Sequence, residues 1–206
     1  MKEIIGFHGT KLENVNSIIL DNFKIAEIKK TDNHWLGHGI YFFNDYELAK
    51  WWADTKVTSH IKKYARKSIA SVVRAKIKVE NIMDLDNPFV MNRLEQYCQE
   101  LEEEIVAQGI ILNFVMGDNS KKGLILAKQR KRCFWLDKIK QDKNIDVFIY
   151  TFTKNDPSYA ISKYHVSAIK ELGFNYNEKQ ICVSKVEFIV ERSSIDENSV
   201  REVIIV

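Results

Sequence analysis

Residues 35–43 read Trp-Leu-Gly-His-Gly-Ile-Tyr-Phe-Phe and form the most distinctive segment of the chain. Two glycines bracket His38, and glycine permits backbone torsions and close approaches that a Cβ would block. The β-branched and aromatic run over 40–43 predicts a buried or half-buried strand. On its own, this segment predicts a tight corner followed by a strand, in which Tyr41 serves equally well as core packing or as a binding residue.

A helix is expected on either side of this segment. Downstream, Asp45 is a suitable N-cap for a helix over 46–56. Upstream, a strand over 2–7 precedes a helix whose apolar residues recur at spacings of three and four, with Thr10 as a candidate cap. The residues of this apolar face are Leu12, Val15, Ile18 and Ile19.

The remaining sequence predicts a mixture of helices and strands. Helices are expected over 58–67, from Pro88 to a stop at Gly109, and over 123–142, the last one basic, with Phe134 and Trp135 toward the core. Strands are expected over 68–79, 146–153 and 179–191, and residues 158–172 fit a helix or a structured loop. This order predicts a single α+β domain over 1–206, in which 57–145 is a helical, basic, insertion-like middle region.

Composition restricts the class of protein. The chain has 206 residues, 45% of them hydrophobic and 29% charged, as expected for a soluble globular domain. It has no apolar run of the roughly 20 residues that a bilayer span requires and no signal peptide, so we expect a cytoplasmic protein without a membrane partner. Cys98, Cys133 and Cys182 are widely spaced, which favours reduced thiols over a catalytic cysteine or a zinc site.

Three short segments resemble a known catalytic pattern. They are His8-Gly9-Thr10 after the first strand, Gly39-Ile40-Tyr41-Phe42 in the second, and Asn177-Glu178 at the start of a late one. In order and context they resemble the His–Tyr–Glu pattern of ADP-ribosyltransferases of the diphtheria-toxin and poly(ADP-ribose) polymerase type. Asn14 also lies where such enzymes have it. The resemblance covers the first fifty-odd residues and about the last thirty.

The resemblance implies a fold, a reaction and a set of roles. The fold has split central antiparallel β-sheets with flanking helices. The reaction cleaves NAD⁺ between nicotinamide and ribose and transfers ADP-ribose to an acceptor, without a metal. His8 would bond a ribose hydroxyl, Tyr41 would stack on nicotinamide, and Glu178 would grip a ribose hydroxyl and stabilise the oxocarbenium-like transition state. The implied catalytic residues are His8, Tyr41 and Glu178, and the implied NAD⁺-binding residues are His8, Gly9, Thr10, Asn14, Gly39, Tyr41, Trp51 and Trp52.

The chain departs from the family pattern in two places. Ala49 stands where the polymerases have a serine that binds the carboxamide, and Tyr176 stands where arginine-modifying relatives have Gln or Glu. Glu187 and Glu191 compete with Glu178 for the catalytic role. We choose Glu178 because it opens the strand and because alternation places it on one face with Gln180 and Cys182.

The acceptor is predicted from charge. Residues 120–143 hold nine Lys or Arg against two Asp, a local charge of +7 in a chain of net charge +3. Such a patch attracts phosphates, and aromatic neighbours stack on unpaired bases, which slightly favours RNA over protein as the acceptor. The predicted acceptor-binding residues are Lys128, Arg130, Lys131, Arg132 and Gln180.

Other interpretations stay open at this level. The basic region equally fits a solvated helix face or a docking site for an antitoxin, since a compact catalytic domain of this kind resembles bacterial or phage-related toxins and defence effectors. The reaction could be mono- or poly-ADP-ribosylation, or NAD⁺ hydrolysis by a glycohydrolase toxin. A catalytically inactive module that binds NAD⁺ or ADP-ribose is a further alternative.

Overall fold

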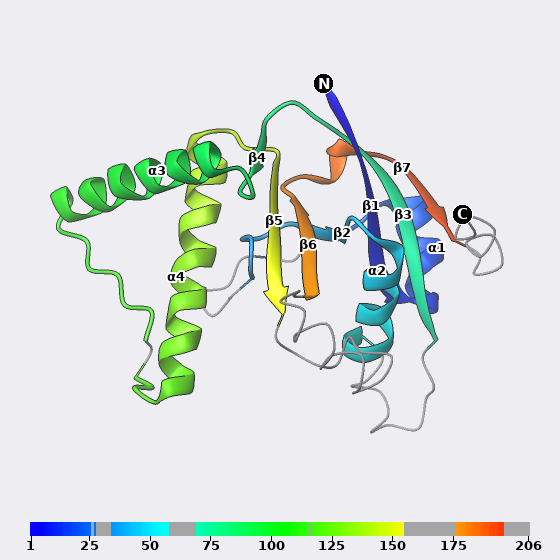
Figure 1. Ribbon diagram of the computed structural model, residues 1–206, viewed down its shortest axis with the longest axis horizontal. Helices are drawn as coiled ribbons and strands as arrows, with labels where there is room; N and C mark the ends of the chain where they lie inside the picture. The colour runs from blue at the N-terminus through cyan, green and yellow to red at the C-terminus, as the bar shows by residue number, and fades with distance from the viewer. Residues whose placement is uncertain (26, 28–33, 58–68, 116, 155–175, 196–206) are drawn as a thin grey trace.

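Seven strands form one mixed sheet in the order β4-β5-β6-β2-β1-β3-β7 (Figure 1). The structure is a computed structural model that describes residues 1–25, 27, 34–57, 69–115, 117–154 and 176–195. The strands are β1 (Lys2–Lys11), β2 (Ile40–Phe43), β3 (Ala70–Val79), β4 (Ile82–Asp84), β5 (Val147–Lys154), β6 (Tyr176–Val183) and β7 (Ile189–Ser194). The helices are α1 (Leu12–Asp21), α2 (Tyr46–Trp52), α3 (Pro88–Ala107) and α4 (Lys121–Asp142), with a π-helical turn at Ala53–Val57 and a 3₁₀ turn at Val186–Phe188.

The sheet has two halves joined at a narrow point. Strands β1 and β3 pair along ten residues and β5 and β6 along eight, whereas β1 and β2 share the single pair Phe7↔Phe43. The expected α+β class is confirmed. The expectation of purely antiparallel sheets is wrong in one respect, because β4 pairs with β5 in parallel. The near-separation between β1 and β2 leaves space between two strands that would otherwise pair.

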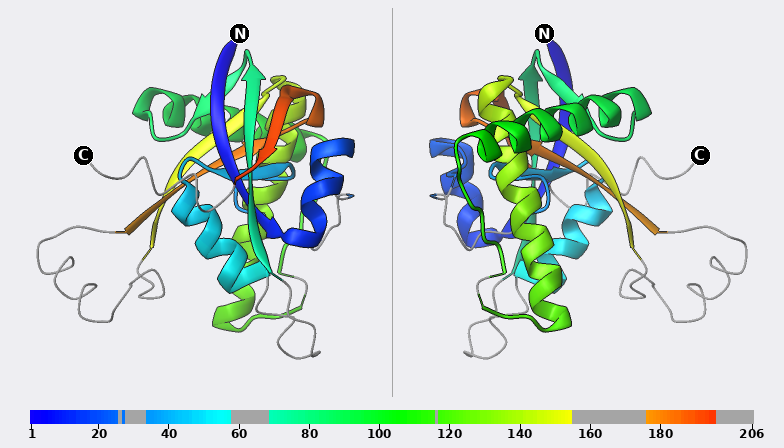
Figure 2. Two further views of the ribbon diagram at one scale, coloured as in Figure 1. Left: turned by 90° about the vertical axis from the view of Figure 1, so that its right-hand side faces the viewer. Right: turned by 90° about the vertical axis from the view of Figure 1, so that its left-hand side faces the viewer.

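Helices cover both faces of the sheet. Helix α1 packs three residues of its predicted apolar face, Val15, Ile18 and Ile19, against a core that includes Phe42 and Val73. The fourth, Leu12, is wrongly predicted, because it is 50% exposed at the start of the helix. Helix α2 lies on the opposite side of β1 and β3, as the left view of Figure 2 shows. Helix α4 buries Trp135 and Leu136 against β5, and Phe134 packs beside them, so the expected core-facing side of this helix is confirmed. Helix α4 of the predicted middle region therefore shares a core cluster with β5 and β6.

Helix starts follow the local sequence in three of four cases. Asp45, Asn87 and Ser120 each accept a hydrogen bond from a backbone N–H in the first turn of the helix that follows. The exception is Thr10, predicted to cap α1. The N-cap is Lys11, without a side-chain cap, because β1 continues through Thr10 and pairs it with Ser71. The predicted segments 58–67 and 158–172 lie outside the described residues. Among the described residues, no helix is both long enough and apolar enough to cross a bilayer.

The single strand predicted over 179–191 is wrong. The chain leaves β6 after Val183, makes the 3₁₀ turn, and enters β7, which pairs with β3 in the other half of the sheet. The Ser184 N–H bonds the Asp146 carbonyl at the departure point. The hydrophobic pattern runs on through this turn because Val186 and Phe188 still pack against the core, so periodicity alone could not reveal the change of partner.

Candidate functional site

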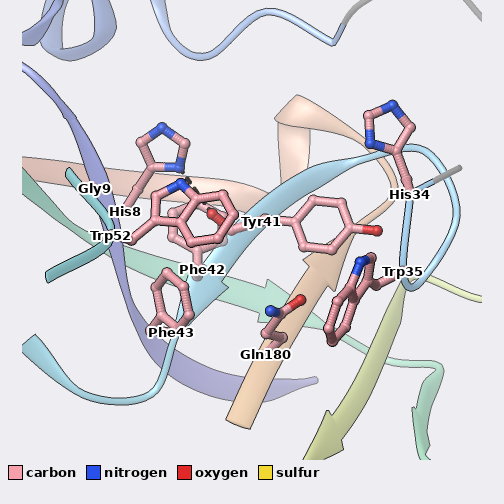
Figure 3. A pocket seen from close by; sticks show the side chains of 9 residues that line it. All are labelled: His8, Gly9, His34, Trp35, Tyr41, Phe42, Phe43, Trp52 and Gln180. Atoms are coloured by element: carbon pink, nitrogen blue, oxygen red, sulfur yellow. Dashed lines mark hydrogen bonds between the residues drawn. The ribbon is translucent and has the colours of Figure 1, made fainter. Parts of the chain in front are cut away.

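A pocket of about 290 Å³ opens where β1 and β2 diverge. Side chains from β1, β2, α2, β6 and the segment before β2 surround it (Figure 3). Because these elements are distant in sequence, only the folded chain assembles the pocket. Its lining residues are His8, Gly9, His34, Trp35, Tyr41, Phe42, Phe43, Trp52 and Gln180.

His8 bridges the gap between the two strands. Its Nδ1 lies 2.8 Å from the backbone oxygen of Tyr41, so the neutral ring donates from Nδ1 and leaves Nε2 as an acceptor. The ring packs edge-on against Phe23 and Phe42. Burial lowers the pKa of His8 below its ordinary value, and the bond to Tyr41 only partly offsets this effect. At neutral pH the pocket therefore contains an uncharged imidazole that can accept a hydrogen bond from a hydroxyl group.

The hydroxyl of Tyr41 is held by the glycine segment that precedes β2. It donates to the Gly37 carbonyl at 2.6 Å and accepts from the Leu36 N–H at 2.7 Å. Burial raises the pKa of this hydroxyl well above its ordinary value, so the side chain stays neutral. With its hydroxyl engaged, Tyr41 contributes its ring to the pocket, which suits stacking rather than acid–base chemistry.

Helix α2 contributes Trp52 to the pocket lining, and the ring centroid of Trp52 lies 6.1 Å from that of Phe43. The helix sits so close to β1 that a Cβ on Gly9 would overlap the backbone carbonyl of Ala49. The glycine is therefore explained by packing, a reason that the sequence analysis did not identify. Ala49 is fully buried against Phe43 and Val72 and does not line the pocket. Trp51 also lies outside the lining, with the Lys56 ammonium 5.6 Å from its ring centroid.

Glu178 lies fully buried next to the pocket, where the Gln180 amide donates to its carboxylate. Gln180 lines the pocket, and Glu178, Gln180 and Cys182 alternate along β6 as predicted. The two competing glutamates lie elsewhere: Glu187 is exposed on the 3₁₀ turn, and Glu191 pairs with Lys76 at the edge of the sheet. Of the three candidates, Glu178 alone shares the strand and the face of a pocket residue.

Several predicted residues lie away from the pocket. Thr10 is buried and accepts a weak bond of 3.4 Å from the exposed Asn14, and neither is part of the lining. Gly39 packs against β6, where a Cβ would lie 2.5 Å from the Val183 carbonyl oxygen. Conversely, the sequence analysis missed His34 and Trp35 as pocket residues, because they precede the strand and follow no helix or strand periodicity.

The structure does not gather the predicted acceptor residues in one place: four are on α4 and Gln180 is on β6. Lys128 and Lys131 line a second pocket, of about 690 Å³, between α3 and α4, and Lys131 pairs with Glu102 at 3.4 Å. Arg130 donates to the Phe114 carbonyl. Arg132 reaches toward the first pocket, with its guanidinium 5.7 Å from the Trp35 ring centroid, and Gln180 lines that pocket. The predicted acceptor residues therefore lie at more than one site.

A cluster on α4 anchors the segment that holds Tyr41. Asp137 accepts from both the backbone N–H and the ring of His38, and the Lys140 ammonium donates to the His38 carbonyl. We call Asp137 and Lys140 the His38 clamp. Lys140 also lies 3.6 Å from the Asp137 carboxylate, and the side chains of all three residues are at most 14% exposed. Helix α4, which belongs to the predicted middle region, thus holds the segment whose Leu36 N–H and Gly37 carbonyl bond the Tyr41 hydroxyl.

The same cluster contains a set of donor atoms that could hold a metal ion. His38, Cys133 and Asp137 each offer one atom within 4.8 Å of the others. The neighbouring Lys140 ammonium opposes a bound cation. Burial, followed in importance by the nearby Asp137 charge, raises the pKa of Cys133 to about 12, so the thiol is protonated at neutral pH. These features favour an ion-pair cluster with a structural role.

Comparison with known proteins does not assign the chain to a family: no protein-family model, no curated protein and no solved structure matches it.

Proposed function

We propose that the protein is a mono-ADP-ribosyltransferase that cleaves NAD⁺ at the bond between nicotinamide and ribose. The observation that carries this proposal is the convergence of His8, Tyr41, Trp52 and Gln180 on one pocket, with Glu178 buried beside it. Sequence resemblance selected four of these residues, His8, Tyr41, Trp52 and Glu178, from separate parts of the chain. Their gathering around a single cavity is what an NAD⁺ site of the His–Tyr–Glu type requires.

The pocket suits one half of the dinucleotide. Small-molecule sites in proteins have volumes of roughly 300–1,000 Å³, so a cavity of about 290 Å³ fits nicotinamide and its ribose, with the adenosine half outside. The nicotinamide ring stacks on Tyr41, with Trp52 on the side of the pocket formed by α2. His8 accepts a hydrogen bond from a ribose hydroxyl through Nε2, the nitrogen that the bond to Tyr41 leaves as the acceptor.

Glu178 supplies the electrostatic part of the reaction. In the proposed complex a hydroxyl of the nicotinamide ribose replaces the Gln180 amide as the partner of its carboxylate. The bond between C1′ and the nicotinamide nitrogen breaks with its electron pair leaving on nicotinamide. The positive charge that develops on the ribose is stabilised by the Glu178 carboxylate in a largely water-excluded site. The acceptor then bonds to C1′ and loses a proton to solvent. Ala49 contributes nothing to carboxamide binding, which falls to the backbone of Gly9.

The test replaces Glu178 by glutamine, which keeps the shape and removes the charge. Glu178→Gln should lower nicotinamide release about 10²–10³-fold, the usual cost of losing one electrostatic contact to the transition state, while NAD⁺ binding measured by calorimetry persists. Glu187→Gln, at an exposed position on the 3₁₀ turn, is the matched control and should retain full activity. Undiminished activity in Glu178→Gln would refute the site. Nicotinamide release without labelling of any macromolecule would assign the protein as an NAD⁺ glycohydrolase instead.

An ADP-ribosyltransferase that modifies a macromolecule fits a toxin or defence effector, and an antitoxin that binds the basic residues of α4 stays a prediction.

A further inference from the structure

Three aromatic rings extend in a row from the pocket. Trp35, which lines the pocket, contacts Phe152 of β5 edge-to-face with centroids 4.5 Å apart. Phe152 in turn contacts Tyr150 at 4.7 Å. Trp35 and Tyr150 are only half-buried, so both ends of the row reach solvent. We call these three residues the aromatic shelf.

Arg132 covers the aromatic shelf with its guanidinium. The carbon at the centre of this group lies 5.7 Å from the Trp35 ring centroid and 5.9 Å from that of Phe152, within the range of cation–π contacts. The Nε atom is inaccessible to solvent and has no hydrogen-bond partner. Within the part of the chain that the structure describes, no carboxylate forms an ion pair with Arg132, and its guanidinium packs on two rings.

Several of the other basic residues of this region are paired with acidic partners. Lys131 pairs with Glu102, Lys138 with Asp142, and Lys143 with Glu100. Arg132 differs from them in both respects that matter for binding an anion: its charge is not compensated by a carboxylate, and it lies next to the pocket. Its planar fork of donors also matches phosphate geometry.

We propose that the aromatic shelf and Arg132 bind an unpaired nucleotide of a single-stranded nucleic acid, which is the acceptor for ADP-ribose. This inference rests on the proposed function. A base stacks on the exposed part of the shelf, and the guanidinium of Arg132 contacts the adjoining phosphate. A protein acceptor could bind Arg132 through an acidic side chain, but it would not need three contiguous aromatic rings. The row of aromatic residues therefore favours a nucleic acid. A duplex is disfavoured because its bases are already stacked on one another.

The experiment measures two products from the same reaction. NAD⁺ labelled in its adenylate phosphate is incubated with a mixed-sequence single-stranded RNA, the matching single-stranded DNA, the duplex, and a pool of cellular protein. Labelled acceptor and released nicotinamide are both quantified. The wild-type enzyme should label a single strand in preference to the duplex and to protein, and the RNA and DNA arms show which sugar it accepts.

The variants localise the acceptor site. Stacking contributes about 1–3 kcal/mol per base, which corresponds to a 5- to 150-fold loss of affinity when a ring is removed. Arg132→Met and Tyr150→Leu should therefore each lower the labelled strand formed per nicotinamide released at least fivefold and weaken binding of a fluorescent oligonucleotide. Arg93→Met, an exposed arginine on α3, is the matched control and should change neither quantity. Circular dichroism shows whether each variant is folded, and Tyr150→Leu provides the test if Arg132→Met is not.

Each outcome has one meaning. Label on protein alone overturns the inference and leaves NAD⁺ cleavage intact. Unchanged oligonucleotide binding in both Arg132→Met and Tyr150→Leu does the same. Absence of nicotinamide release from the wild-type enzyme overturns the proposed function itself.

Discussion

Replacing Asp137 by alanine should destabilise the protein far more than a neighbouring charge deletion on the same helix. Asp137 accepts the backbone N–H of His38 at 2.7 Å and its ring nitrogen, and it lies 3.6 Å from the Lys140 ammonium. The side chains of Asp137 and Lys140 are 14% and 7% exposed, so solvent screens the pair weakly. Removing one partner of a buried pair and leaving the other charged costs about 3–5 kcal/mol. Domains are usually stable by only about 5–15 kcal/mol, so this loss is a large fraction of the total.

The assay is urea unfolding followed by circular dichroism, with Asp142→Ala as the matched control. Asp142 pairs with Lys138 at 3.7 Å on α4, but both side chains are 43% exposed, so its loss should cost less than about 1 kcal/mol. Replacing both members of the clamp, as Asp137→Leu with Lys140→Met, should recover part of the stability, because no uncompensated charge stays buried while the His38 N–H and carbonyl still lose their partners. Equal costs for Asp137→Ala and Asp142→Ala, or no recovery in the double variant, would contradict this account of the His38 clamp.

Three further predictions follow from the pocket and the core. Gly9→Ala should lower the free energy of unfolding by about 1–3 kcal/mol, because the new Cβ overlaps the Ala49 carbonyl and α2 must move. A thermal melt checks this prediction. An unchanged melting midpoint would mean that α2 does not pack as closely as described. Acidification should destabilise the protein through His8, whose folded pKa lies below its ordinary value of 6.5: its contribution is complete above pH 6.5 and falls as the pH decreases from there toward the folded pKa. His8→Asn should flatten the dependence of unfolding free energy on pH in that window, and an identical pH profile would rule out His8 as its source. Cys133 should react slowly with thiol reagents at pH 8, since its pKa of about 12 keeps it protonated and it is 2% exposed; rapid labelling that Cys133→Ser abolishes would show that the buried cluster opens.

Local sequence was sufficient for much of the secondary structure. The strand Ile40–Phe43, the N-cap at Asp45 and the helix that begins at Pro88 all formed as predicted. These features depend on residues within about four positions of one another, because caps and hydrophobic periodicity act over a single turn or pleat. The alternation that places Glu178 and Gln180 on one face of β6 belongs to the same class.

The pocket and its surroundings were decided by contacts between residues far apart in the chain. His38 and Asp137 are separated by 99 positions, and no periodicity joins them. Trp35 and Arg132 meet for the same reason, across the packing of α4 against β5. Local sequence patterns predicted most of the described helices and strands, but not β4 or the break after Val183. The separation of β1 and β2 after one pair and the change of partner after β6 depend on tertiary packing, because filling a core constrains side chains whose positions in the sequence are unrelated.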